Sequence, residues 1–269
     1  MNRAAVFVWD ERGVYPAQSG NRISILRVYE VKQDFELAGK EIFQDGKTMI
    51  RAVFWDNDGV LVDTEKLYFQ ATRELLGEAG ITLTESLFQR ISLKEGRSAF
   101  DLALEKGVTQ GEVDRLHARR NERYTELVRR GVRILDGVEE TLATLKQQVL
   151  QAIVTSSRRT HFDAMHVKTG LPRHFDFILT REDYTLSKPN PEPYLLALSR
   201  SGFKPEECLV VEDSERGFRA ALAAKIRCIV VPNSLSRGGD FTGAWRIFRS
   251  CREIPGEIER LSGNDGVIK

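Results

Sequence analysis

The sequence contains little cysteine: three residues in 269, at Cys208, Cys228 and Cys251, with no C-x-x-C pair among them. An odd number without regular spacing excludes a disulfide framework as the basis of the fold. Scattered free thiols are typical of a reducing compartment, so we expect a cytoplasmic protein.

The sequence also lacks an apolar run long enough to span a membrane. In MNRAAVFVWDERGV, a short apolar patch is followed at once by Asp10 and Glu11, without a small-residue cleavage site. We therefore expect no signal peptide and no membrane partner.

Neither sign of charge dominates, because 40 lysines and arginines are balanced by 39 aspartates and glutamates. This balance gives no indication of a nucleic acid as partner. The basic stretches 118–123 and 128–133 are accompanied by Glu122 and Glu126, which is typical of solvated helix faces.

What the sequence does contain is an alternation of short apolar segments with helix-like segments. Each apolar segment is brief and mostly apolar on both faces, as expected for strands that are buried in a parallel sheet. The alternation predicts a doubly wound α/β domain with a Rossmann-like, three-layer core. The predicted strands are 50–55, 150–154, 177–179, 208–211 and 228–231, and the predicted helices are 138–147, 161–169, 191–200 and 215–224.

Residues 65–133 interrupt this alternation, because they contain no good strand and their pattern is helical throughout. Glycines at 77, 80, 107 and 131 separate the helical stretches. We expect an all-helical subdomain inserted after the first strand. Ligands of open α/β sheets bind at the carboxyl ends of the strands, so this insertion would cover the site like a lid.

The remaining segments complete the expected division into domains. Residues 1–48 have no partner that we can identify, and we expect an N-terminal extension that is poorly ordered. Residues 49–64 and 134–245 would form the α/β core. Residues 246–269 would form a C-terminal tail, with a helix near 254–262 and no chemistry.

Two carboxylates stand two residues apart where the first predicted strand ends, in VFWDNDGVLVDTE. Asp56 and Asp58 would be costly to bury unpaired. On their own they are compatible with a turn, since Asp is common at strand ends and Gly59 supplies a permissive backbone. In a catalytic interpretation, Asp56 is a nucleophile that attacks phosphorus and Asp58 is a general acid and base. Such a site needs a cation to offset its negative charge.

Hydroxyl groups and a lysine follow two later strands. Thr155, Ser156 and Ser157 come directly after an apolar strand, where they either cap the next helix or hold phosphate oxygens. Lys188 lies in the proline-rich loop SKPNPEPY. A lone loop lysine is usually solvated, but a fixed cation there would neutralise Asp56 and a phosphate.

A second acidic pair, Glu212 and Asp213, lies in VVEDSERG between a predicted strand and a helix. The pair is compatible with acidic capping of that helix. It is equally suited to complete an oxygen shell for Mg²⁺, with Gly217 allowing the helix to pack tightly on the strand. Each motif is weak alone, but all of them, in this order at strand ends, favour chemistry.

Through these motifs the chain resembles the haloacid dehalogenase-like superfamily of phosphohydrolases, over about residues 49–233. DNDGVLVDTE, IVTSS, SKPNPEPY and VVEDSERG are similar to its first to fourth motifs. The resemblance is strongest to the branch of β-phosphoglucomutase and phosphoglycolate phosphatase. In that branch a mobile helical cap is inserted after the first motif, where residues 65–133 lie.

The resemblance implies a role for each acidic motif residue and for the lysine. Asp56 would be the nucleophile and a Mg²⁺ ligand. Asp58 would be the acid and base, with its backbone carbonyl on the metal. Lys188 would stabilise Asp56 and the phosphate, and Glu212 and Asp213 would hold the metal.

The resemblance also implies a substrate-binding set. Thr155 would bind the transferring phosphoryl group, helped by Ser156, and Gly59 completes the set beside the nucleophile. Arg97, in SLKEGRSAF, matches a cap position that often contacts the distal part of the substrate. A surface arginine at a helix start is an equally good interpretation of Arg97.

Several positions separate the branches of the family. Asp58, which the dehalogenating members lack, favours phosphoryl transfer. Tyr68 stands where the mutases typically carry a histidine, which favours simple hydrolysis. Trp55 and Asn57, on either side of the nucleophile, are less usual than phenylalanine and a small apolar residue, and the sequence explains neither.

We therefore expect a Mg²⁺-dependent phosphatase that hydrolyses a small phosphorylated metabolite, a sugar phosphate or a similar phosphomonoester, through an aspartyl-phosphate. A sugar-phosphate mutase and a non-catalytic binding protein on the same scaffold are the alternatives. We expect a monomer or homodimer. His161 and His166 share no clear helix face, so we expect no metal pair there.

Overall fold

The computed structural model describes residues 7–10, 13–16 and 49–263. Strands β1 (Phe7–Asp10) and β2 (Gly13–Pro16) pair antiparallel in a two-stranded sheet of their own. The expectation of a poorly ordered extension over residues 1–48 otherwise lies outside the described residues.

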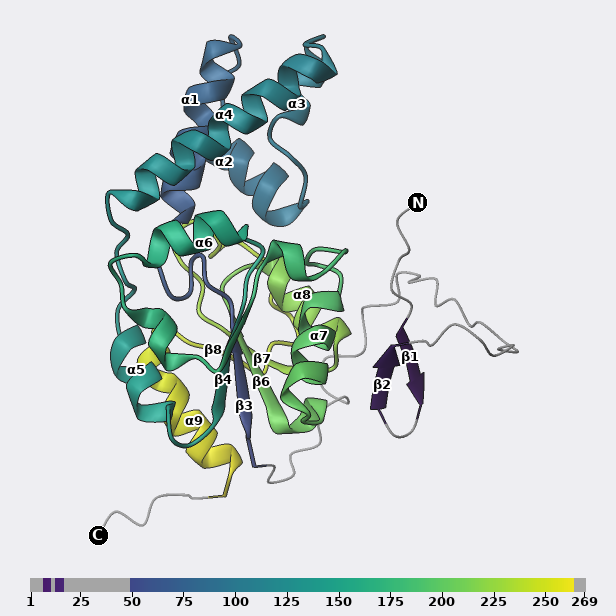
Figure 1. The fold of residues 1–269 in the computed structure, drawn as a ribbon, viewed down its shortest axis with the longest axis vertical. Helices are drawn as coiled ribbons and strands as arrows, with labels where there is room; N and C mark the ends of the chain where they lie inside the picture. Colours follow the sequence, from purple (N-terminus) through teal and green to yellow (C-terminus); the bar gives the residue numbers. More distant parts are fainter. Residues whose placement is uncertain (1–6, 11–12, 17–48, 264–269) are drawn as a thin grey trace.

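A six-stranded sheet forms the centre of the molecule, and all its strand pairs are parallel (Figure 1). The strand order β5-β4-β3-β6-β7-β8 puts the first strand of the domain, β3, in the middle. Strands β4 and β5 are added on one side of β3, and β6, β7 and β8 are added on the other. This reversal of strand order creates a topological switch point beside β3. The strands are β3 (Ala52–Trp55), β4 (Leu150–Val154), β5 (Phe177–Leu179), β6 (Cys208–Glu212), β7 (Arg227–Val230) and β8 (Arg246–Ile247).

Helices cover both faces of this sheet, so the fold has the three layers that the alternating pattern predicts (Figure 1). Successive side chains of a strand point to opposite faces. Val53 and Trp55 of β3 pack with α5, α6 and α9, whereas Ala52 and Phe54 pack with α7 and α8. The covering helices are α5 (Val138–Leu145), α6 (Arg159–His166), α7 (Glu192–Ser201), α8 (Glu215–Ala223) and α9 (Ile254–Leu261).

The helical insertion follows β3 and packs around a hydrophobic cluster of its own, which includes Leu76, Phe88 and Phe100. Thr84 and Thr109 cap two of its helices by accepting hydrogen bonds from backbone N–H groups in the first turn. The insertion stands above the carboxyl ends of the strands (Figure 1), and α4 contacts α6 of the core. Its helices are α1 (Glu65–Glu78), α2 (Glu85–Phe88), α3 (Asp101–Glu105) and α4 (Gln110–Arg129), with a π-helical turn over Gln89–Lys94.

The C-terminal segment, which we expected to be a tail, adds two elements to the core. Strand β8, which the sequence did not predict, pairs with β7. Helix α9 buries Ile254, Ile258 and Leu261 in the same cluster as α5. Each such side chain contributes about 1.5–3 kcal/mol when it is fully buried, so this segment stabilises the domain.

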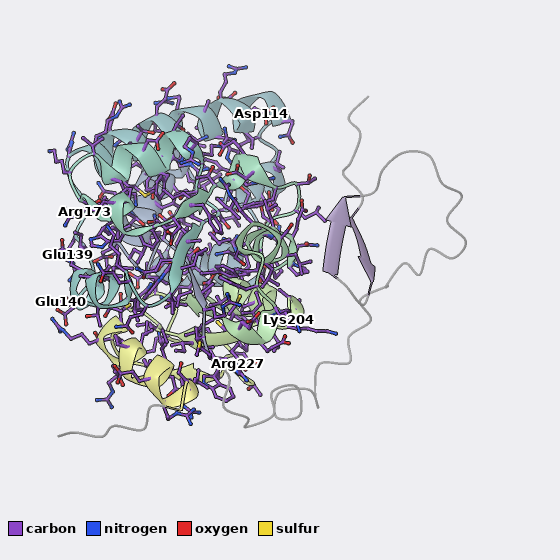
Figure 2. The ribbon with its side chains drawn as sticks, turned by 60° about the horizontal axis from the view of Figure 1, so that its bottom comes forward. Asp114, Glu139, Glu140, Arg173, Lys204 and Arg227 are labelled. Atoms are coloured by element: carbon purple, nitrogen blue, oxygen red, sulfur yellow. The ribbon has the colours of Figure 1, made fainter. Side chains whose placement is uncertain are left out.

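Many charged residues lie on the surface. Glu139 and Glu140 in the first turn of α5 and Lys204 point outward from the core (Figure 2). Among the described residues, none of the helices combines the length and apolar character that crossing a membrane requires.

Candidate active site

Three parallel strands bring predicted site residues to one edge of the sheet. Asp56 follows β3, Thr155 follows β4, and Glu212 is the last residue of β6. The backbone N–H of Asp56 donates to the carbonyl of Val211, which extends the β3–β6 ladder to the site. Because these strands are neighbours in register, residues more than 150 positions apart lie side by side.

Lys188 lies at the centre of this cluster, with only 4% of its surface exposed. Its Nζ donates to Oδ1 of Asp56 at 2.6 Å, to Oε1 of Glu212 at 2.7 Å and to the carbonyl of Val154 at 2.8 Å. An ammonium group has three N–H donors, and all three are therefore used. The lysine is fixed rather than solvated, in contrast to the usual behaviour of a loop lysine.

Glu212 is held on both of its carboxylate oxygens. Oε1 accepts from Lys188 and from the hydroxyl of Tyr194, and Oε2 accepts from the side chain and backbone of Ser214. A Cβ at Gly217 would lie 1.8 Å from Oε1 of Glu212. Only glycine fits there, so α8 packs directly against the carboxylate, as the sequence predicted.

Asp56, Glu212 and Asp213 form a buried acidic group that can hold a cation. Each offers a carboxylate oxygen, and these oxygens lie within 4.8 Å of one another. All-oxygen donor sets of this kind suit Mg²⁺, which usually takes one or two carboxylates and keeps several waters. The donor chemistry therefore fits the magnesium ion that the sequence predicts.

The pKa values show how much negative charge is crowded here. Burial raises the pKa of Asp56 to about 8, against the opposing effect of Lys188. Burial also raises the pKa of Asp213 well above its usual range, and the charges of Glu65 and Glu212 add to it. Burial acts on Glu212 in the same direction, but Lys188 and the hydrogen bonds from Tyr194 and Ser214 together outweigh it and lower that pKa. A divalent cation would offset this repulsion.

The carboxylate of Asp58 has hydrogen-bond partners other than those of that acidic group. Its Oδ1 accepts from the hydroxyl of Thr64 at 2.6 Å and from that of Tyr124 at 3.3 Å. Its Oδ2 accepts from Ser157 at 2.8 Å and from Thr155 at 3.1 Å. The side chains of the two first-motif aspartates thus have separate surroundings, as separate roles require.

The hydroxyls after β4 lie as predicted beside the site, but they are not equivalent. The hydroxyl of Thr155 is buried and donates to Asp58, and it accepts from the backbone N–H of Ser157. Ser156 and Ser157 line the cavity described below. Ser157, which the predicted set of site residues did not include, contacts Asp58 more closely than Thr155 does.

Gly59 has a positive φ of 86° and packs against the acidic group. A Cβ there would lie 2.6 Å from Oδ2 of Asp213 and 2.6 Å from Nδ2 of Asn233. Among the residues that line the cavity, Gly59 is not found. We predicted contact with substrate, whereas the structure places Gly59 where it makes room for Asp213.

A cavity of about 630 Å³ separates the helical insertion from the core and has Asp56, Asp213 and Lys188 in its floor. Its walls come from the insertion on one side and from the loops after β4 and β6 on the other. The aromatic and basic side chains that the insertion contributes are Tyr68, Phe88, Arg97, His117, Arg120 and Tyr124.

Two arginines of the insertion line the cavity, and they differ in exposure and in their partners. Arg97, the predicted substrate contact, is 48% exposed and binds the carboxylates of Asp101 and Glu105. Arg120 is only 7% exposed and lies 4.3 Å from the ring of Tyr68. Its hydrogen-bond partners are Asn121, Thr72 and His117, and it forms no ion pair with a carboxylate of the described residues. Arg120 lies in the basic stretch 118–123, for which we expected a solvated helix face, and its burial differs from that expectation.

Tyr68 stands in the wall of the cavity, in edge-to-face contact with Tyr124 at 5.2 Å. His161 also lines the cavity, whereas His166 lies behind it against Asn57. Within the part of the chain that the structure describes, one cluster of three or more acidic, histidine or cysteine side chains could hold a cation, and it is Asp56, Glu212 and Asp213.

The sequence analysis did not predict three further site residues, and only one of them has a local signal. Thr64 and Tyr124 both donate to Asp58, and Tyr124 comes from α4 of the insertion. Asn233, from the loop after β7, donates to Asp213 at 2.8 Å and to Glu65 at 2.7 Å. Thr64 lies in the DTE segment of the first motif and could have been found there.

The family model of haloacid dehalogenase-like hydrolases matches residues 53–231. Protein CbbY of Rhodobacter capsulatus is 32% identical over 210 residues, which cover 74% of this chain and 92% of that protein. The phosphorylated carbohydrates phosphatase of Thermotoga maritima is 33% identical over 195 residues, 70% of this chain and 88% of that enzyme.

The fold comparison agrees. A crystal structure of CbbY from Rhodobacter sphaeroides, in complex with xylulose-(1,5)bisphosphate, aligns with a TM-score of 0.66 and 27% identity. The alignment covers 76% of this chain and 96% of that one. The predicted resemblance and fold class are thereby confirmed, and the chain belongs to the haloacid dehalogenase-like hydrolases, as a phosphatase with a helical cap.

Proposed function

We propose that the protein is a Mg²⁺-dependent phosphatase that hydrolyses a small phosphorylated sugar through an aspartyl-phosphate on Asp56. One observation carries the proposal: Lys188 joins Asp56 and Glu212 by hydrogen bonds of 2.6 and 2.7 Å in the floor of a cavity that the cap covers. A buried lysine fixed between carboxylates is a preorganised cation for a phosphoryl group.

The cap side of the cavity supports a substrate that carries a second anionic group. Arg120 is buried there, without an ion pair to a described carboxylate. A buried cation is stable when an anion or a hydrogen-bonding partner compensates its charge. A second phosphate or a carboxylate of the substrate would supply that charge. A bisphosphate, such as the ligand named for the CbbY structure, carries a second phosphate of this kind.

In the first step, a carboxylate oxygen of Asp56 attacks phosphorus and forms the acyl phosphate. The bond between phosphorus and the ester oxygen breaks, and its electron pair goes to that oxygen. Asp58, protonated at this stage, transfers its proton to the leaving oxygen. Lys188 stabilises the negative charge on the transferring group.

In the second step, Asp58 accepts a proton from water. The water oxygen attacks phosphorus, the bond between phosphorus and Asp56 breaks, and inorganic phosphate is released. Asp56 returns as a carboxylate and Asp58 as a carboxylic acid, so the enzyme is regenerated. One residue thus acts first as acid and then as base.

Asp56, Glu212, Asp213 and the backbone carbonyl of Asp58 would hold the magnesium ion. When bound, the ion supplies positive charge that neutralises the phosphate oxygens and the crowded carboxylates. Burial raises the pKa of Asp213, and the positive charge of a bound ion would lower it again.

The mutase and the non-catalytic binding protein are less well supported. Tyr68 lines the cavity and occupies the sequence position at which the mutases typically carry a histidine. A binding protein would not need a nucleophile, a fixed lysine and a metal group together. We also propose residues 65–133 as the cap and residues 49–64 and 134–245 as the core, to which β8 and α9 of the C-terminal segment add. The cytoplasmic location and the monomer or homodimer stay predictions.

A phosphate-release assay over a panel of sugar phosphates and sugar bisphosphates, with and without Mg²⁺, tests the proposal. The wild-type protein should release phosphate from at least one member of the panel only when Mg²⁺ is present. The variant Asp56→Asn should release none, while Asp176→Asn, away from the cavity, should stay active. Full turnover by Asp56→Asn would overturn the proposed function, and so would an inactive wild-type protein.

A further inference from the structure

Asn57, between the two first-motif aspartates, is completely buried. Its backbone carbonyl accepts from the N–H groups of Leu61 and Val62 and so closes the turn after β3. Any residue could make these backbone contacts. A buried side-chain amide is costly unless it is hydrogen-bonded, so the amide of Asn57 needs an explanation beyond the turn.

The amide of Asn57 links a histidine to the proposed acid and base. Its Oδ1 lies 2.8 Å from Nε2 of His166, and its Nδ2 lies 3.3 Å from Oδ2 of Asp58. Nδ2 also lies 3.4 Å from Sδ of Met165. The opposite amide orientation would set two acceptor oxygens, Oδ1 and the carboxylate of Asp58, against each other. The carboxylate therefore fixes the amide with its NH₂ group towards Asp58.

His166 completes the chain of contacts on its far side. Its Nδ1 lies 2.8 Å from the hydroxyl of Thr169, and its ring packs on Phe162 at 4.4 Å. Burial lowers the pKa of His166 to about 4, so the ring is neutral at neutral pH. A neutral imidazole has one donor and one acceptor. Nε2–H donates to Asn57, and Nδ1 accepts from Thr169.

In this series of three hydrogen bonds, each residue donates to the next, from Thr169 through His166 and Asn57 to Asp58. Hydrogen bonds that run in one direction polarise and strengthen one another. The other donors to Oδ2 of Asp58 are hydroxyls, which rotate freely about their C–O bonds. The amide of Asn57 is planar and its Oδ1 is held by His166, so the direction of its N–H groups is fixed.

We propose that Asn57 and His166 are positioning residues, which hold Oδ2 of Asp58 and orient its carboxyl group for proton transfer to the leaving oxygen. The inference rests on the proposed function, because it needs Asp58 as the general acid. It explains a buried amide and a buried histidine that the turn, the metal group and the cavity do not use.

The inference makes a specific kinetic prediction. A sugar phosphate has a poor leaving group that needs the proton of Asp58, whereas p-nitrophenyl phosphate releases a stable nitrophenolate without one. The ratio kcat/KM reports the steps up to departure of the leaving group. A misoriented Asp58 should therefore lower kcat/KM for the sugar phosphate alone, whereas general structural damage lowers it for both substrates.

The experiment measures kcat/KM of the full chain for both substrates in Asn57→Leu and His166→Leu. We expect a fall of about 10-fold to 100-fold for the sugar phosphate and of less than about 3-fold for p-nitrophenyl phosphate. His166→Gln, whose amide can still donate to Asn57, should recover most of the loss. Met165→Leu is the matched control, since it removes only the sulfur contact of Asn57 and should leave both values unchanged.

Equal losses for both substrates, or no loss for either, would overturn the positioning role. If Asn57→Leu does not fold, Thr169→Val removes the hydroxyl that contacts His166, together with its hydrogen bond from the N–H of Leu171, and should shift the same ratio in the same direction. A wild-type protein that cleaves neither substrate would instead refute the proposed function, and the positioning role with it.

Discussion

The ammonium nitrogen of Lys188 lies 2.6 Å from Oδ1 of Asp56, across 132 positions of sequence. Both groups are buried, and the same nitrogen contacts Glu212. The charges of the two carboxylates raise the pKa of Lys188 above its usual value although burial opposes this, so the lysine stays charged. This contact ties the first, third and fourth motifs into one site.

Replacing Lys188 by methionine should remove both a catalytic charge and a structural one. We expect kcat to fall by about 100-fold to 1,000-fold, because a fixed positive charge beside the transferring phosphoryl group is lost. Without metal, the free energy of unfolding should fall by about 3–5 kcal/mol, since two buried carboxylates lose their partner. Steady-state kinetics and denaturant unfolding check the two effects. Lys106→Met, exposed on the cap, should change neither, and an active Lys188→Met would contradict the assigned role.

Magnesium should stabilise the folded protein through Asp213. A ligand present at 100 times its dissociation constant adds about 2.7 kcal/mol to the free energy of unfolding. Thermal unfolding with increasing Mg²⁺ should therefore show a rising midpoint in the wild-type protein. In Asp213→Asn the rise should be much smaller at equal concentrations, and EDTA should abolish phosphatase activity. An equal rise in both proteins would show that the ion binds elsewhere.

His166 should make stability depend on pH in a defined window. Its pKa is about 4 in the folded protein, against an ordinary value of 6.5. As the pH falls below 6.5, the unfolded chain takes up a proton before the folded one does, so this contribution is complete above pH 6.5 and is lost towards pH 4. Between pH 7.5 and 5 the loss should be about 2 kcal/mol.

Denaturant unfolding at those two pH values checks the effect of His166. His166→Gln cannot take up the proton, so its free energy of unfolding should fall less over the same interval. Other groups titrate equally in both proteins and cancel in the comparison. Parallel pH dependence in the two proteins would show that His166 is not the group that titrates.

Arg120 should contribute to the choice of substrate, and Arg97 should not. Arg120→Met is expected to raise KM for a sugar bisphosphate by about 10-fold to 100-fold, which corresponds to the loss of a charge-assisted hydrogen bond. KM for the matching monophosphate should change little. Arg97→Met should change either KM by less than about 3-fold, because the guanidinium of Arg97 is engaged by Asp101 and Glu105. The reverse order of effects would favour the original prediction for Arg97.

The core of this site could be predicted because its residues stand at the ends of apolar strands. Parallel strands deliver their carboxyl ends to one edge, so Asp56 and Glu212 had to meet once the sheet order was right. Lys188 lies in a loop, but its proline-rich surroundings and its place in the order of motifs singled it out.

The rest of the site depends on tertiary packing that leaves no local pattern. His166 reaches Asn57 across 109 residues, and Tyr124 reaches Asp58 across 66. Arg120 looks like part of a basic, solvated helix until the cap folds over the cavity. Strand β8 is only two residues long, too short to show an alternating pattern.

Chemical trapping of the intermediate tests the central claim, that Asp56 carries the phosphoryl group. The protein is mixed with a substrate, quenched within milliseconds and treated with borohydride, which reduces an acyl phosphate to an alcohol. Peptide mapping by mass spectrometry then locates the reduced residue. The account predicts homoserine in place of Asp56, and none in Asp56→Asn. Reduction at another residue, or none at Asp56 during active turnover, would contradict it.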